Sequence, residues 1–144
     1  MQTAMLFIFF VSLASSAGTL WDEAMDFLDI LVSQGYYVGG ITELEITYLE
    51  PCTLGTSPGF LTDKPGGYLI AMGGNHILNL ELELQGTGWS IVDTLPDDFP
   101  VLEVDSQQVA TASRIILLAR DMTHCSLQDS VVVMWVLLPV DRDQ

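Results

Sequence analysis

The chain has 144 residues, of which 49% are hydrophobic, and its nineteen acidic and four basic residues give a formal net charge of −15. This length suits one domain with a substantial core, and the hydrophobic content excludes a disordered tail despite the high charge. The charge repels phosphates and anionic headgroups, which argues against nucleic acid and membrane-surface binding and favours solubility, cationic partners or divalent cations.

Residues 1–17, MQTAMLFIFFVSLASSA, are typical of a secretory signal peptide. The apolar run Ala4–Leu13 is too short to span a bilayer, which takes about 20 apolar residues, and small residues end the segment at Ala17. We therefore expect an exported protein, periplasmic or extracellular, with no stable membrane insertion after cleavage. The segment lacks a Lys or Arg near its start, so a retained anchor or a start other than Met1 is the alternative.

The next segment, Thr19 to Gln34, predicts one amphipathic helix. Its apolar residues recur at helical spacing on one face, with Thr19 as N-cap, acidic residues in the first turn and Gly35 as the stop. This helix either packs against the following domain or serves as a docking arm. The chain thus divides into a signal peptide (1–17), a helix (18–35) and a third segment (36–144).

From Ile41 the apolar period changes from 3.6 to 2, which indicates half-buried β-strands. Seven runs predict strands, and Gln85–Gly88 joins two of them as a hairpin: Glu43–Tyr48, Tyr68–Met72, Asn79–Leu84, Trp89–Val92, Val101–Val104, Arg114–Ala119 and Val131–Leu138. Turn residues at regular spacing separate these runs. The predicted fold is mainly β: an antiparallel, jelly-roll-like β-sandwich preceded by one amphipathic α-helix.

A resemblance to a known family lies in Gly66–Gly74, followed by the alternating strand Leu78–Leu84 and the turn Gly86-Thr87-Gly88. Over about 41–138 the chain resembles the bacterial pre-peptidase C-terminal domain, a small jelly-roll-like β-sandwich attached to secreted bacterial proteins. The resemblance implies an exported, non-catalytic accessory module, and it implies no substrate.

The acidic segment 93–98 is the candidate metal site. Asp93, Asp97 and Asp98 offer three carboxylates on a turn that contains a proline, and Ca²⁺ takes six to eight oxygen ligands. Asn79, Glu81 and Glu83 add oxygens if that strand lies nearby. Calcium is therefore the only cofactor suggested, and the alternative is a solvated turn in which aspartates accept backbone hydrogen bonds.

Cys52 and Cys125 are the only cysteines, and in an exported protein they form either a disulfide or two separate buried thiols. His76 and His124 lack metal-ligand spacing. The sequence also contains neither a Gly-x-Ser-x-Gly elbow nor a phosphate-binding glycine loop.

Tyr36, Tyr37 and Trp89 are candidates for contact with a partner, a protein or a glycan of the cell envelope; the alternative is that these aromatic residues belong to the core. The sequence as a whole favours an exported, non-enzymatic binding or accessory protein of a bacterial cell envelope. Two alternatives are a metal-assisted hydrolase using the 93–98 loop and a structural or assembly protein that pairs through an edge strand.

Overall fold

The computed structural model describes residues 19–46, 53–61, 66–75, 77–93, 95, 97–122 and 129–137. Two helices and eight strands lie within these ranges. In chain order they are α2 (Leu20–Ser33), β1 (Tyr37–Ile46), β2 (Thr53–Thr56), β3 (Gly67–Gly73), β4 (Ile77–Gly86), β5 (Trp89–Asp93), β6 (Val101–Val104), α3 (Ser106–Thr111), β7 (Ala112–Met122) and β8 (Asp129–Leu137).

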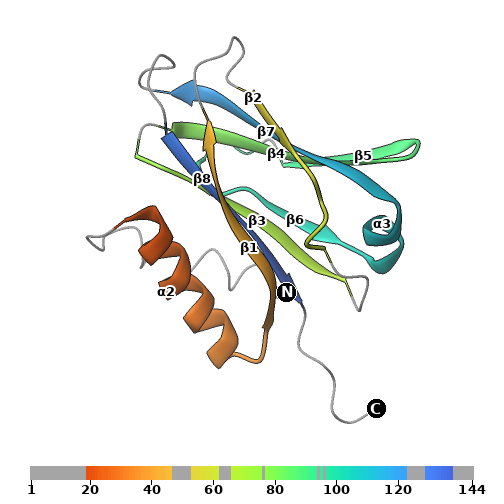
Figure 1. Ribbon diagram of the computed structural model, residues 1–144, viewed down its shortest axis with the longest axis horizontal. Coiled ribbons are helices and arrows are strands. Elements are labelled where there is room, and N and C mark those ends of the chain that lie inside the picture. Colours follow the sequence, from red (N-terminus) through yellow and green to blue (C-terminus); the bar gives the residue numbers. More distant parts are fainter. Residues whose placement is uncertain are drawn as a thin grey trace.

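The strands form two four-stranded antiparallel sheets that pack face to face (Figure 1). Sheet A has the order β1-β8-β3-β6, and sheet B has the order β2-β7-β4-β5. Consecutive strands mostly alternate between the sheets, which is the arrangement of a jelly roll. The predicted fold class, an antiparallel jelly-roll-like sandwich preceded by an amphipathic helix, is confirmed.

Sheet A is buried on both faces, and this produces two hydrophobic cores. Val131, Val133 and Trp135 of β8 face sheet B in one core, whereas Val132, Met134 and Val136 face α2 in the other. The central strands β3 and β8 are therefore apolar nearly throughout, as covered strands must be. Figure 1 shows α2 lying across the outer face of this sheet.

Helix α2 forms where its sequence pattern predicts. The Thr19 hydroxyl accepts a hydrogen bond from the Asp22 N–H at 3.1 Å, and Gly35 adopts φ 99° just after the helix. Its core face is completely buried, and Phe27 meets Phe99 edge-to-face with ring centroids 5.2 Å apart. The helix is thus an integral layer of the fold.

The predicted alternation in β4 is also confirmed. Leu80, Leu82 and Leu84 are fully buried, while Glu81 and Glu83 lie on the other face of sheet B. The hairpin from β4 to β5 is present as well, with the pair Gly86–Trp89 closing it.

Two short elements were not predicted, β2 and α3. Strand β2 has only four residues and includes a glycine, so its pairing with β7 carries little local signal. Helix α3 has a capping box between Asp105 and Gln108, and this motif is visible in the sequence. The helix has only six residues and none of them is buried, so the sequence shows no apolar periodicity that would support the prediction of a helix there. None of the helices in the described ranges has the length and apolar character needed to cross a membrane.

Candidate functional site

The acidic loop between β5 and β6 carries the chain from sheet B to sheet A. Asp93 Oδ1 accepts the Leu95 N–H at 2.9 Å, and its Oδ2 accepts the Val101 N–H at 2.8 Å. Asp97 Oδ1 accepts the Phe99 N–H at 3.0 Å. These aspartates therefore act as backbone acceptors that hold the crossover, as the solvated-turn alternative describes.

The described residues of the same loop do not converge as a set of metal ligands. Across the described ranges, no group of three or more His, Cys, Asp or Glu side chains is placed to hold a metal ion. Near the loop, Asn79 Oδ1 is buried without a hydrogen-bond partner in the described structure, and the Leu80 N–H donates to the Asp97 carbonyl at 2.7 Å. Calcium binding by Asp93, Asp97 and Asp98 stays a prediction.

Burial makes three carboxylates of this region weaker acids. It raises the pKa of Asp98, and the neighbouring Asp97 adds to the rise. Burial also raises the pKa of Asp97 against the opposing effect of the Phe99 N–H. The pKa of Glu23 on α2 is raised by burial and then by Asp98, so the loop and the first turn of α2 repel each other.

We predict that Asp98→Asn stabilises the protein at pH 7. A raised pKa means that the native state binds the proton more tightly than the unfolded state, so the cost of ionisation is fully present at neutral pH. Stability should therefore rise as the pH falls from 7 through the raised pKa values towards about 4. Urea unfolding at several pH values should show a smaller rise for Asp98→Asn than for the parent.

The matched control is Asp26→Asn on the exposed side of α2, which removes the same charge from an open surface. It separates the burial of Asp98 from the general benefit of reducing the net charge of −15. If Asp98→Asn proved no more stabilising at pH 7 than Asp26→Asn, the buried-carboxylate explanation would be wrong.

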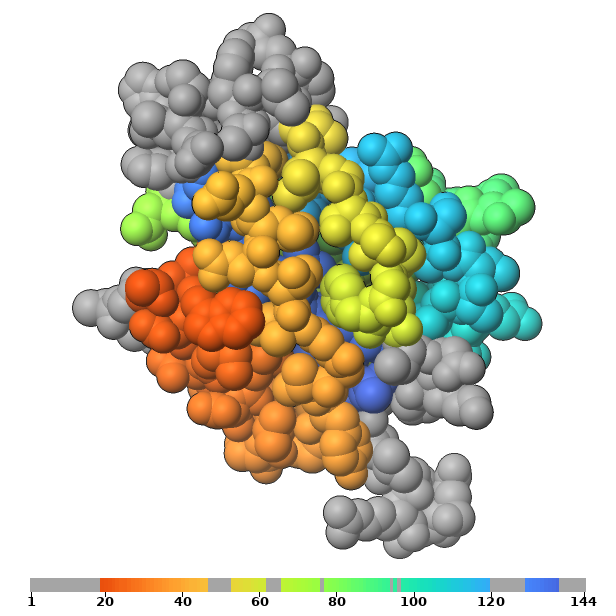
Figure 2. All heavy atoms as spheres, in the orientation of Figure 1, coloured from red at the N-terminus to blue at the C-terminus, as the bar shows by residue number. Residues whose placement is uncertain are grey.

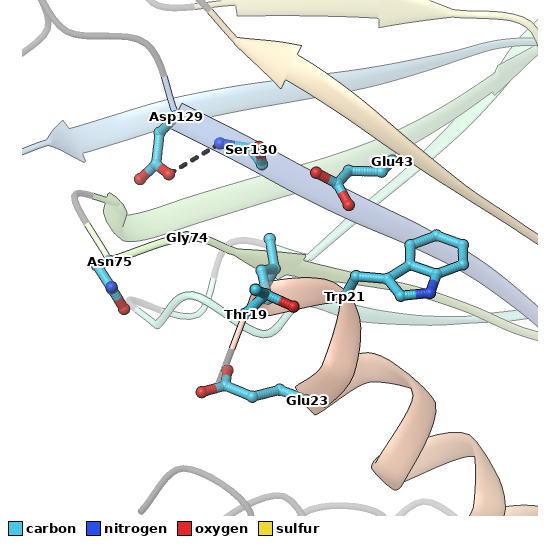
Figure 3. Close-up of a pocket in the computed structure, with 9 residues that line it drawn as sticks. Thr19, Trp21, Glu23, Glu43, Gly74, Asn75, Asp129 and Ser130 are labelled. Carbon is cyan, nitrogen blue, oxygen red and sulfur yellow. Dashed lines mark hydrogen bonds between the residues drawn. The ribbon is translucent and has the colours of Figure 1, made fainter. Parts of the chain in front are cut away.

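A pocket of about 420 Å³ opens where the start of α2 meets β1 and β8 (Figure 3). Trp21 extends from the first turn of α2 towards β1, from which Glu43 projects, and Glu23 lies on the other side of that turn. Asp129 Oδ1 accepts the Ser130 N–H at 2.8 Å at the far end. Gly74 leaves room for that carboxylate, because a Cβ at this position would overlap it. The pocket is thus acidic with one aromatic wall.

Beside this pocket, large apolar side chains are exposed along α2 and the start of β1. Trp21 (38% exposed), Met25 (36%) and Val32 (52%) follow helical spacing along one stripe of α2. Tyr37 (47%) and Val38 (42%) begin β1. Val38 is opposite Val136, which faces α2, whereas Tyr37 is opposite Leu137 and points to the other face of sheet A. We call Trp21, Met25, Val32 and Val38 the α2–β1 surface; Figure 2 shows α2 and β1 next to each other on one face of the molecule.

Sequence reasoning did not single out this surface. The stripe Trp21–Met25–Val32 borders the core face of α2, so in the sequence it merges into one wide apolar arc. Trp21, Met25 and Val32 lie at i, i+4 and i+11, and this spacing is the one feature of the sequence that places them on a common stripe of the helix. Only the packing of α2 on sheet A shows which part of the arc is left outside.

The three predicted contact aromatics lie in three different environments. Tyr37 is exposed, on the face of β1 turned away from α2, and its role as a contact stays a prediction. Tyr36 is only 3% exposed and packs near Tyr68 at a centroid distance of 6.4 Å, so it belongs to the core and its assignment as a contact is corrected. Trp89 is half-buried: its indole covers Gly86, and Nε1 donates to Thr111 Oγ1 at 2.9 Å.

We predict that Trp89→Phe lowers the free energy of unfolding by about 1 kcal/mol, because it keeps a ring over Gly86 but removes the hydrogen bond to α3. The same substitution should have no effect of this kind in a Thr111→Val background, where the acceptor is already gone. Chemical denaturation of the two single variants and the double variant tests this, and strictly additive losses would contradict it.

Cys52, Cys125, His76 and His124 lie outside the described residues. The predicted disulfide between the two cysteines therefore stays a prediction.

No protein-family model and no curated protein sequence matches the chain. The solved structures that are similar to it include two from viruses. One is the C-terminal domain of A223, a structural protein from Sulfolobus turreted icosahedral virus, with 15% identity and a TM-score of 0.35 over 72% of this chain and 98% of that one. The other is tomato aspermy virus, with 8% identity and a TM-score of 0.35 over 84% and 97%.

The strand order and the packed cores define this chain as a jelly-roll β-sandwich with a helix covering sheet A. A jelly roll serves many functions, so any function has to be argued from the surface features described above. The resemblance to the pre-peptidase C-terminal domain rests on the sequence motifs alone.

Proposed function

We propose that this chain is an exported, non-enzymatic jelly-roll module of the cell envelope that works by binding another protein. The observation that carries the proposal is the α2–β1 surface, where four large apolar side chains lie exposed on adjacent elements. Grouped apolar exposure of this kind marks interaction sites, whereas single exposed apolar residues are ordinary.

The packing of the sandwich supports a surface function. Both faces of sheet A and the inner face of sheet B are filled by hydrophobic side chains, with Trp135 and Leu69 fully buried between the sheets. The interior is therefore a packed core. The pocket beside the exposed apolar stripe of α2, in contrast, is lined by polar and charged side chains such as Glu23, Glu43 and Asp129.

Export is supported by the signal-like segment 1–17, with its short apolar run and its small residues ending at Ala17. N-terminal sequencing of the protein recovered from the cell envelope or the medium tests this part. A mature chain that begins at Gly18 would support export, and a cytoplasmic protein that retains Met1 would overturn it.

Affinity capture from envelope extract tests the binding function. The parent protein is compared with a Trp21→Ser, Val32→Ser variant and with a control, Val92→Ser, Leu95→Ser, whose residues are 51% and 54% exposed elsewhere. A partner retained by the parent and the control, but lost by the α2 variant, would support the proposal.

A broad hydrolase screen of the same purified protein, with metal analysis, tests the opposing class. Turnover that disappears on substituting Asp97 or Asp98, together with stoichiometric Zn²⁺ or Mn²⁺, would replace this proposal with a metal-assisted hydrolase.

A further inference from the structure

Strand β1 forms one edge of sheet A. It pairs with β8 along Tyr37–Ile46, with a register shift between Val38 and Gly40, and no other described strand pairs with its second edge. Ten residues of strand extend over about 33 Å. An edge of this length presents backbone N–H and C=O groups that can pair with an extended segment of another chain.

The side chains of β1 show where such a segment would lie. Val38, Ile41 and Glu43 are opposite Val136, Met134 and Val132 of β8, which all face α2. Alternate side chains of an added strand would therefore point to the same side. There they would meet the exposed stripe of α2, since Trp21 and Glu43 line one pocket (Figure 3).

Charge decides between the candidate occupants of this edge. Glu43 and Glu45 are exposed on β1, and each chain carries a net charge of −15. A second copy would bring its own glutamates and a further net charge of −15 to this edge, and like charges repel each other. A segment that carries lysine or arginine would instead find opposite charge at Glu43 and Glu45.

We propose that the free edge of β1 binds an extended basic segment of a partner protein, which adds a fifth strand to sheet A. Its apolar side chains lie on Met25 and Val32, and a lysine or arginine enters the pocket between Trp21 and Glu43. The indole face and the carboxylate both attract a cation. This inference rests on the proposed function and specifies the partner's chemistry.

Synthetic peptides test the inference on the purified protein expressed from its full sequence. The probe is the acetylated, amidated peptide RTRTVTVT, whose arginines and valines share one face and whose antiparallel pairing sets the arginines beside Glu45 and Glu43. The matched probes are ETETVTVT, with the charge reversed, and RTRTTTTT, without the apolar residues. Binding is measured by fluorescence anisotropy at physiological salt, because low salt exaggerates surface electrostatics.

We expect RTRTVTVT to bind at least tenfold more tightly than either matched probe. Glu43→Gln and Trp21→Ser should each weaken that binding at least fivefold. The controls are Glu103→Gln, an exposed glutamate on β6 at the opposite edge of sheet A, and Val92→Ser on β5. Hydrogen exchange should show new protection of β1 amides when the peptide is bound.

Three results would overturn the inference: no binding of RTRTVTVT, equal binding by the Glu43→Gln and Trp21→Ser variants, or a dimer of the chain that these variants abolish. In the first two cases, partner capture that depends on Trp21 and Val32 would still support the proposed function. The two proposals therefore fail separately.

Discussion

Substitution of Phe27 by alanine is expected to lower the free energy of unfolding by about 3–5 kcal/mol. Phe27 is fully buried at the centre of the core between α2 and sheet A, where its ring meets Phe99 edge-to-face at 5.2 Å. Truncation leaves a cavity against β3 and β8, whose backbones are fixed by pairing on both sides and cannot close it. Urea unfolding followed by circular dichroism measures the loss.

Met25→Ala on the exposed face of the same helix is the matched control and should cost less than about 1 kcal/mol. The comparison separates packing from helix propensity, because alanine is the best helix former in both cases. Nearly equal small losses for both variants would mean that α2 is a detachable docking arm, the alternative that the sequence left open.

The parts of the fold that were predictable are those whose signals are local. Helix α2 has an N-cap at Thr19, a stop at Gly35 and an apolar face at helical spacing, all within seventeen residues. Strand β4 alternates leucine with polar residues for six positions. These local patterns agree with the way the two elements pack in the structure. Each element can therefore be predicted without knowing which other segments it packs against.

The unpredicted parts depend on pairing between distant segments. Strand β2 is a strand because β7 offers it an edge, with Thr53 opposite Leu118. Tyr36 is buried because Tyr68 of β3 lies beneath it. The repulsion between Glu23 and Asp98 joins residues 75 positions apart. No spacing rule within the sequence contains these relations.

The candidate site combines both kinds of information. The carboxylates of the 93–98 loop were noticed for their density, yet Asp93 uses both oxygens to hold the crossover between the sheets. The α2–β1 surface has fewer distinctive residues, but α2 and β1 place Trp21 and Glu43 around one pocket. The cluster of acidic residues in the sequence was therefore a weaker guide to the candidate site than the contact between α2 and β1, which only the structure shows.

Gly67→Ala is expected to destabilise the protein by about 3 kcal/mol, at the upper end of the usual range for overpacking. Gly67 lies in sheet A between Val104 of β6 and Leu137 of β8. A Cβ there would overlap the Val136 carbonyl oxygen and approach the Leu137 Cα to 3.2 Å. These are backbone atoms of a central strand, so the clash can be relieved only by a shift of β3 or β8 against the other.

Gly73→Ala at the other end of β3 is the matched control. Its new Cβ would meet the Ile77 Cβ at 3.0 Å, a contact that a shift of a few tenths of an ångström relieves, whereas the Cβ at Gly67 would overlap a backbone oxygen outright. Alanine also reduces the entropy of the unfolded chain at both sites, so the difference between the two variants isolates the backbone clash. Thermal and urea unfolding should rank Gly67→Ala well below Gly73→Ala, and the reverse order would contradict the close packing of β3 against β8.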